Sequence, residues 1–95
     1  MADLVRRVPT DALYPRASVE LLANTYQAWA SRFRLRADVL WAQMLYETGG
    51  LRFGGDVQPY QHNLCGLRLP DGSGFYTFPN LQAGAIAHIA HLAVH

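Results

Sequence analysis

The residue of this chain whose type and position best fit acid–base chemistry is Glu47. It closes a largely apolar stretch and is followed by Thr48-Gly49-Gly50, and a glycine directly after a periodic stretch is typical of a helix end. The helix dipole disfavours a negative charge in the last turn, and we expect Met44, Leu45 and Tyr46 to shield the carboxyl from water. Both effects favour a protonated carboxyl, which a general acid requires. The alternative is an ordinary glutamate on the surface of a helix.

The loop after Glu47 has the composition of a site for a polar ligand. Gly49-Gly50 and Gly54-Gly55 allow tight turns and a close approach of a ligand to the backbone. Asp56 follows the second glycine pair, and Asn63 brings both a hydrogen-bond donor and an acceptor. An acid at the end of a rigid helix that faces such a loop predicts a cleft for a polar substrate.

A family resemblance supports this interpretation. The residues that carry it are Gln43, Glu47-Thr48-Gly49, Phe53-Gly54-Gly55-Asp56-Val57, Pro59, Gln61, Asn63 and Gly66, and later Phe78-Pro79, Gly84 and His91-Leu92. In these motifs the chain resembles the glucosaminidase domains of bacterial cell-wall hydrolases over about residues 20 to 93. The resemblance implies a mainly α, lysozyme-like small helical domain with a short β-hairpin lobe. It also implies cleavage of peptidoglycan after N-acetylglucosamine, with Glu47 as the general acid.

The second catalytic group is left open by the sequence. Cleavage of a glycosidic bond needs a proton on the leaving oxygen and stabilisation of an oxocarbenium-like centre. Asp56 is the better candidate for a second carboxylate, although it could instead accept hydrogen bonds from loop amides. The acetamido group of the substrate is the other candidate nucleophile, and it would leave one essential acid in the protein. We slightly favour this substrate-assisted route.

Seven residues are candidates for contact with substrate. They are Gln43, Phe53, Tyr60, Gln61, Asn63, Tyr76 and Phe78. Gln43 precedes Glu47 by one helical turn on the same face, so it either orients the acid, contacts substrate or makes a structural hydrogen bond. Many members of the family have a tyrosine where this chain has Phe78, so Tyr60 or Tyr76 would have to supply the hydroxyl.

Other departures from the family pattern keep two alternative functions open. The usual Asn-Asn pair is His62-Asn63 here, Leu64 replaces a common phenylalanine, and the domain is shorter than typical members. The same scaffold with one acid fits a lytic transglycosylase, which releases anhydro sugars. A shortened groove fits a non-catalytic module that binds peptidoglycan.

Periodicity predicts three helices, over residues 19–33, 37–48 and 81–94. The second is apolar nearly all round, which predicts a central, buried helix. Ser18 and Asn80 are expected to cap the first and the last. Residues 67–69 and 75–78 flank a Pro-Asp-Gly-Ser-Gly cluster, which predicts a short hairpin. The chain therefore divides into an extended N-terminal lead-in, residues 1–17, and a glucosaminidase-like domain, residues 18–95.

Composition limits the classes of partner. A net charge of +1 argues against nucleic acid, and the absence of an apolar run of about 18 residues argues against membrane insertion. The single cysteine, Cys65, excludes an internal disulfide and is expected to be a buried, small apolar residue. The expected partner is the glycan strand of peptidoglycan. The expected location is secreted or cell-wall-associated, and the lack of a visible signal peptide fits a domain fragment, a phage-borne protein or export by another route.

Three histidines share one face of the last predicted helix: His88, His91 and His95. No acid or cysteine lies at a ligand spacing within that helix, so we predict neither a metal nor another cofactor. The family resemblance suggests that His91 donates a hydrogen bond that fixes this helix beneath the cleft.

Overall fold

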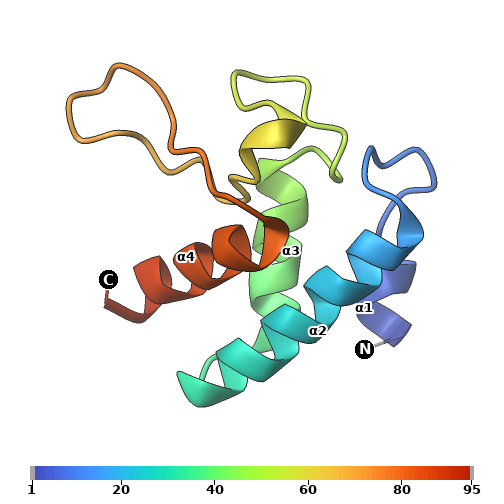
Figure 1. The fold of residues 1–95 in the computed structure, drawn as a ribbon. Coiled ribbons are helices and arrows are strands. Elements are labelled where there is room, and N and C mark those ends of the chain that lie inside the picture. The colour runs from blue at the N-terminus through green and yellow to red at the C-terminus, as the bar shows by residue number, and fades with distance from the viewer. Residues whose placement is uncertain (1, 95) are drawn as a thin grey trace.

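The computed structural model describes residues 2–94 and is mainly helical, as predicted (Figure 1). Its regular elements are α1 (Ala2–Arg6), α2 (Arg16–Arg32), α3 (Ala37–Glu47), the short 3₁₀ helix η1 (Pro59–Gln61) and α4 (Leu81–Val94). The segments that join α3 to α4 gather over the C-terminal end of α3 (Figure 1). That end carries Glu47, so the loops and the candidate acid meet at one side of the molecule.

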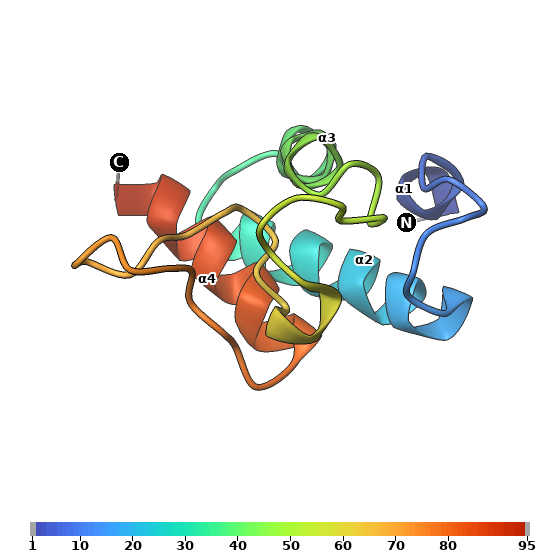
Figure 2. The ribbon, with the colours of Figure 1, turned by 90° about the horizontal axis from the view of Figure 1, so that it is seen from above.

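The centre of the fold is α2, which packs against each of the other three α-helices. It lies between α1 and α4 in both views of the ribbon (Figures 1 and 2). The fully buried side chains come from α2, α3, α4 and the loops that follow α3: Leu22, Ala23, Tyr26, Ala30, Trp41, Met44, Leu51, Leu64, Ala85 and Ile89. Leu4 and Val5 of α1 complete this core.

The prediction that the helix of residues 37–48 is buried on all sides is wrong. Only Leu40, Trp41 and Met44 of α3 are buried, whereas Val39 is 50% and Tyr46 86% exposed. The core takes up one stripe of α3, Ala37 and Leu45 are half-buried at its edge, and Val39, Ala42 and Tyr46 face solvent. The all-round apolar pattern of this helix therefore reflects a core stripe and a second apolar face.

Of the two predicted caps, Asn80 is confirmed and Ser18 is wrong. The last helix spans the predicted residues, and the side-chain oxygen of Asn80 accepts a hydrogen bond from the Ala83 amide at 2.8 Å, as a cap should. The first predicted helix begins three residues early, at Arg16, so Ser18 lies inside its first turn and is not its cap. Pro15 precedes it with extended backbone, and proline is well suited to a helix start because it has no amide hydrogen to satisfy.

The N-terminal lead-in is not simply extended, because α1 forms within it and its apolar side chains enter the core. The rest of the lead-in braces the loop after α3. The Leu13 amide donates to the Leu51 carbonyl at 2.9 Å, and the Tyr14 hydroxyl donates to the Pro59 carbonyl at 2.8 Å. These contacts join segments about 40 residues apart in the sequence, so the lead-in supports the loop beside Glu47.

The structure of residues 2–94 does not contain the two paired strands that the predicted β-hairpin lobe requires. Within residues 2–94 the only extended pairing is one antiparallel bridge between Arg68 and Phe75. The Leu69 amide donates to the Gly74 carbonyl at 2.8 Å, and the Tyr76 amide donates to the Leu67 carbonyl at 3.0 Å. Arms this short offer too few pairs for an independent two-stranded unit, so the segment is a closed loop.

None of the helices within the described residues is both long and apolar enough to cross a lipid bilayer.

Candidate functional site

Glu47 is the last residue of α3, and its exposed side chain borders two hollows in the surface. The larger has a volume of about 680 Å³ and the smaller about 160 Å³. The expectation that neighbouring residues shield the carboxyl from water is wrong: Met44 points into the core, and Tyr46 projects into solvent. The carboxylate instead stands in the open between two concave surfaces.

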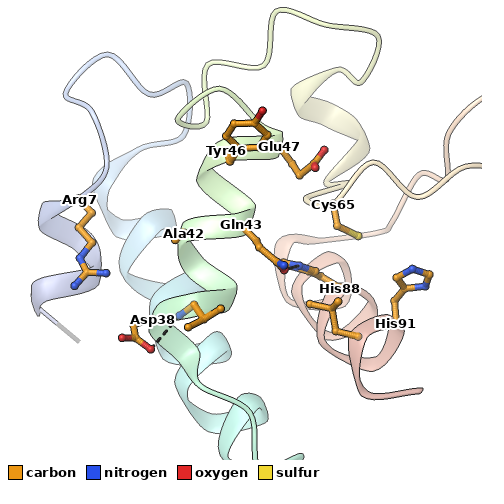
Figure 3. A pocket seen from close by; sticks show the side chains of 11 residues that line it. Arg7, Asp38, Ala42, Gln43, Tyr46, Glu47, Cys65, His88 and His91 are labelled. Atoms are coloured by element: carbon orange, nitrogen blue, oxygen red, sulfur yellow. Dashed lines mark hydrogen bonds between the residues drawn. The ribbon is translucent and has the colours of Figure 1, made fainter. Parts of the chain in front are cut away.

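The larger hollow, here called the groove, runs over the exposed face of α3 (Figure 3). Its lining comes from the residue after α1, from α3 and α4, and from the loop before the bridge: Arg7, Asp38, Val39, Ala42, Gln43, Tyr46, Glu47, Cys65, His88, His91 and Leu92. A further hollow of about 510 Å³ shares Val39, Gln43 and Leu92 with it and extends to the link between α2 and α3. The outward apolar face of α3 is thus the floor of a long depression.

The smaller hollow brings the predicted loop motif to Glu47. It is lined by Glu47, Thr48, Phe53, Gly55, Asp56, Val57, Asn63, Gly66 and Phe75. Asp56, the candidate second acid, is exposed in this lining, and Phe53, a candidate for substrate contact, is half-buried there. The structure therefore brings Glu47, Asp56 and Phe53 to one concavity, as the sequence predicted.

Backbone geometry holds Glu47 in this position. Thr48, which is buried, donates from its hydroxyl to the Met44 carbonyl at 2.8 Å and accepts from the Leu51 amide at 2.9 Å, which fixes the turn after α3. Gly66 has a φ of +68°, and a β-carbon at this position would lie 3.6 Å from Oε2 of Glu47. Glycine at this position thus keeps the space beside the carboxylate open.

A buried hydrogen-bonded chain reaches the groove one turn before Glu47. The Tyr26 hydroxyl lies 2.7 Å from Nδ1 of His88, and Nε2 of His88 lies 3.4 Å from Oε1 of Gln43. His88 is only 3% exposed, and burial, with a smaller contribution from His91, lowers its pKa from 6.5 to about 4. His88 is therefore a neutral imidazole near neutral pH.

The role of His88, which joins α4 to α2 and α3, was not predicted from the sequence. His91 lies exposed in the groove lining, and its predicted part in fixing α4 stays a prediction. The apolar periodicity of the sequence could have identified His88 as buried, because it lies next to Ile89 and one turn after Ala85 on the buried stripe of α4.

Two of the predicted substrate-contacting residues have their polar groups occupied by the fold. Asn63 is buried, donates to the carbonyls of Leu67 and Tyr76 and accepts from the Leu67 amide. Gln61 accepts from the Gln58 amide at 2.8 Å and donates to the Thr77 hydroxyl at 3.3 Å. Both side chains hold loops together.

Three others lie outside the two hollows that Glu47 borders. Tyr60 is 70% exposed on η1, and the rings of Tyr76 and Phe78 stack on each other 6.0 Å apart. The Phe78 amide pairs with the Gln61 carbonyl at 2.8 Å, which holds this segment beside η1. The tyrosine that does line the groove is Tyr46, the neighbour of Glu47, which was not among the candidates.

Cys65 lines the groove and is half-buried. Burial, assisted by the nearby charge of Glu47 and opposed by a hydrogen bond from the Leu67 amide, raises the pKa of its thiol from 9.0 to about 11. The thiol therefore stays protonated at neutral pH and contributes apolar surface.

Among residues 2–94, no group of three or more histidine, cysteine, aspartate or glutamate side chains is arranged to hold a metal ion. His95, the third member of the predicted histidine face, lies outside the described residues.

A mainly helical domain with an acid between two hollows is the class of structure that the chain presents. In comparisons with known proteins it is 37% identical over 78 residues to an uncharacterised protein of Borreliella burgdorferi. The match includes 78% of this chain and 37% of that protein, so the chain spans little more than a third of that relative's length. No family model and no solved structure matches the chain.

Proposed function

We propose that this chain is a lysozyme-like domain that cleaves the glycan strand of peptidoglycan at N-acetylglucosamine, with Glu47 as the general acid. The observation that carries the proposal is the exposed Glu47 carboxylate at the end of a helix, bordered by a concave surface on each side. A linear polymer that occupies both hollows has its backbone over this carboxylate. The sequence motifs around Glu47 favour the glycan strand as that polymer.

In this proposal Glu47 protonates the oxygen that leaves when the glycosidic bond breaks. Gly66 has no side chain, so the space next to Oε2 of Glu47 is available to the leaving oxygen of the substrate. Apolar faces of sugar rings suit the floor of the groove, where Val39 and Tyr46 are exposed. Tyr46 is an amphipathic ring with a free edge, as sugar contacts require.

Two routes then stabilise the oxocarbenium-like centre. Asp56 shares the smaller hollow with Glu47 and is exposed, so it could act as a base toward water. The acetamido group of the substrate could act as the internal nucleophile, in which case Asp56 is dispensable. We favour the second route because a glucosamine-type unit at the cleaved bond carries that group. The variant Asp56→Asn distinguishes the two routes, because it abolishes turnover only if Asp56 acts as the base.

The test is the release of reducing ends from purified peptidoglycan by the wild type and by Glu47→Gln, with mass spectrometry of the products. Glu20→Gln is the matched control, because Glu20 is an exposed helix glutamate on α2, far from the hollows. We expect glucosamine-type reducing ends from the wild type and the control, and a loss of about 100-fold or more in Glu47→Gln.

The products also decide between the proposal and its alternatives. Anhydro sugars lost in Glu47→Gln would indicate a lytic transglycosylase on the same scaffold. Retention of glycan binding by all three proteins without any release would indicate a peptidoglycan-binding module. Equal release by the wild type and Glu47→Gln would remove Glu47 from the chemistry.

The cellular setting of the proposal follows from its substrate. Peptidoglycan lies outside the cytoplasmic membrane, so the domain would act as a secreted or cell-wall-associated enzyme. The chain spans 37% of the Borreliella burgdorferi relative, and further parts of a longer protein would then serve export or attachment to the wall.

A further inference from the structure

The inference concerns the buried chain of side chains that ends at Gln43. Tyr26 on α2 and His88 on α4 are both buried, and the hydrogen-bonded chain runs from the Tyr26 hydroxyl through the His88 imidazole to the Gln43 amide on α3. Figure 3 shows Gln43 and His88 extending toward each other across the gap between α3 and α4. Gln43 itself is exposed and lines the groove.

The direction of each hydrogen bond is assigned from the buried proton that must be paired. Burial raises the pKa of the Tyr26 phenol well above 10, so the hydroxyl keeps its proton, and donation to Nδ1 of His88, 2.7 Å away, pairs that proton inside the core. His88 is neutral, so its one proton is on Nε2, which donates to Oε1 of Gln43. The Tyr26 hydroxyl therefore sets the tautomer of His88, and that tautomer sets which end of the Gln43 amide faces His88.

We propose that Tyr26 and His88 are positioning residues that hold the Gln43 amide with its oxygen turned inward and its NH₂ group presented to the groove, where it donates to the acetamido carbonyl of the glycan. The inference rests on the proposed function and adds a residue that selects N-acetylated sugars. With its oxygen engaged by His88, Gln43 offers only donors to the groove, and a carbonyl oxygen is the complementary group. Gln43 lies one helical turn before Glu47 on the same face of α3, and both line the groove, so a sugar held at the acid lies beside the Gln43 amide.

A first measurement reads the hydrogen-bond directions without any ligand. Nitrogen-15 NMR of the imidazole of His88 in the intact chain should give a neutral ring with its proton on Nε2. A proton on Nδ1 would require Gln43 to point its NH₂ group inward, and that result would overturn the proposal.

A second measurement compares two neutral ligands in the Glu47→Gln background, where turnover is expected to be too slow to consume them during the titration. The probes are a β-1,4-linked tetramer of N-acetylglucosamine and the matching tetramer of glucose, in which a hydroxyl replaces each acetamido group. We expect a preference for the acetylated tetramer of about threefold to tenfold, as one neutral hydrogen bond provides. Gln43→Met should remove that preference, because it keeps the length of the side chain and removes its donor.

The positioning role is tested by Tyr26→Phe, which deletes only the buried hydroxyl. Nδ1 of His88 then loses its donor, the ring is free to change tautomer, and the preference for the acetylated tetramer should fall by about half or more. Tyr14→Phe is the matched control, because it removes a comparable hydroxyl bond, that to Pro59, away from Gln43. The control should retain the preference.

Each outcome has a distinct meaning. Binding of both tetramers with equal affinity would overturn the inference and leave the proposed glycan function standing. Binding of neither would overturn both. A full preference in folded Tyr26→Phe would overturn the positioning role of Tyr26 and His88 and leave Gln43 as the donor.

Discussion

The buried His88 makes the stability of the fold depend on pH in a defined window. Its pKa is 6.5 in an unfolded chain and about 4 in the fold, so the unfolded chain binds the proton more readily. The stabilisation is therefore fully present above about pH 6.5 and is lost as the pH falls through 4. At 1.36 kcal/mol for each pKa unit, the loss amounts to about 3 kcal/mol.

This loss is large relative to the expected stability of the domain. A chain of 95 residues is expected to have an unfolding free energy of about 5–14 kcal/mol. Urea denaturation at pH 7, 6, 5 and 4 should give a midpoint that falls steadily across the range, with the slope of each transition unchanged. Hydrogen bonds lower the pKa of Asp38 and Asp71 from 3.8, so their own contribution to stability begins to be lost only at the acidic end of this range.

The variant His88→Gln isolates the contribution of His88. Glutamine can accept from the Tyr26 hydroxyl and donate to Gln43, but it does not titrate. The unfolding free energy of His88→Gln should be lower than that of the wild type at pH 7. It should also change less than that of the wild type between pH 7 and 4. The reasoning would be refuted by a wild-type unfolding free energy that stays level over this range, or by parallel curves for the two proteins.

Three further predictions concern single positions. Gly84→Ala should destabilise the fold by about 1–3 kcal/mol in urea denaturation, despite alanine's better helix propensity, because a β-carbon at this position would overlap the carbonyl oxygen of His62; unchanged stability would mean that the loop before the bridge yields easily. Asn63→Ala removes three hydrogen bonds of a buried side chain and should cost about 2 kcal/mol or more, and a smaller loss would mean that water replaces them. Cys65 should carry about 100-fold less thiolate at pH 8 than a thiol of pKa 9.0, because its own pKa is about 11, so it should react with a thiol reagent at least about tenfold more slowly, and full reactivity in the folded chain would contradict its burial.

Signals that act within a few residues were readable from the sequence. The glycines after Glu47 ended α3 where they were expected to, and Asn80 capped α4. The loop motif also carried enough information to bring Asp56 and Phe53 to the acid, because the turn from Thr48 to Gly55 is short.

Features that depend on contacts between distant segments were not readable. The central position of α2 depends on its contact with α4, which is distant in the sequence. The apolar pattern of α3 is the same whether a face is buried in the core or forms the floor of the groove. The exposure of Glu47 depends on which way α3 turns its apolar stripe. The role of Gly84 depends on the carbonyl of His62, which reaches it from another segment. Periodicity reports that a face is apolar and does not report what covers it.

The packing of α4 against α2 has a consequence for the order in which the chain can fold during synthesis. The two helices are separated by α3 and by the long loops after it, and the core side chains Ala85 and Ile89 belong to the later one. A ribosome that has produced α1 to α3 therefore holds a nascent chain in which the surface of α2 that packs against α4 has no partner. Completion of α4 would close the core in a single late step, and a chaperone that shields α2 until then would raise the yield of native protein.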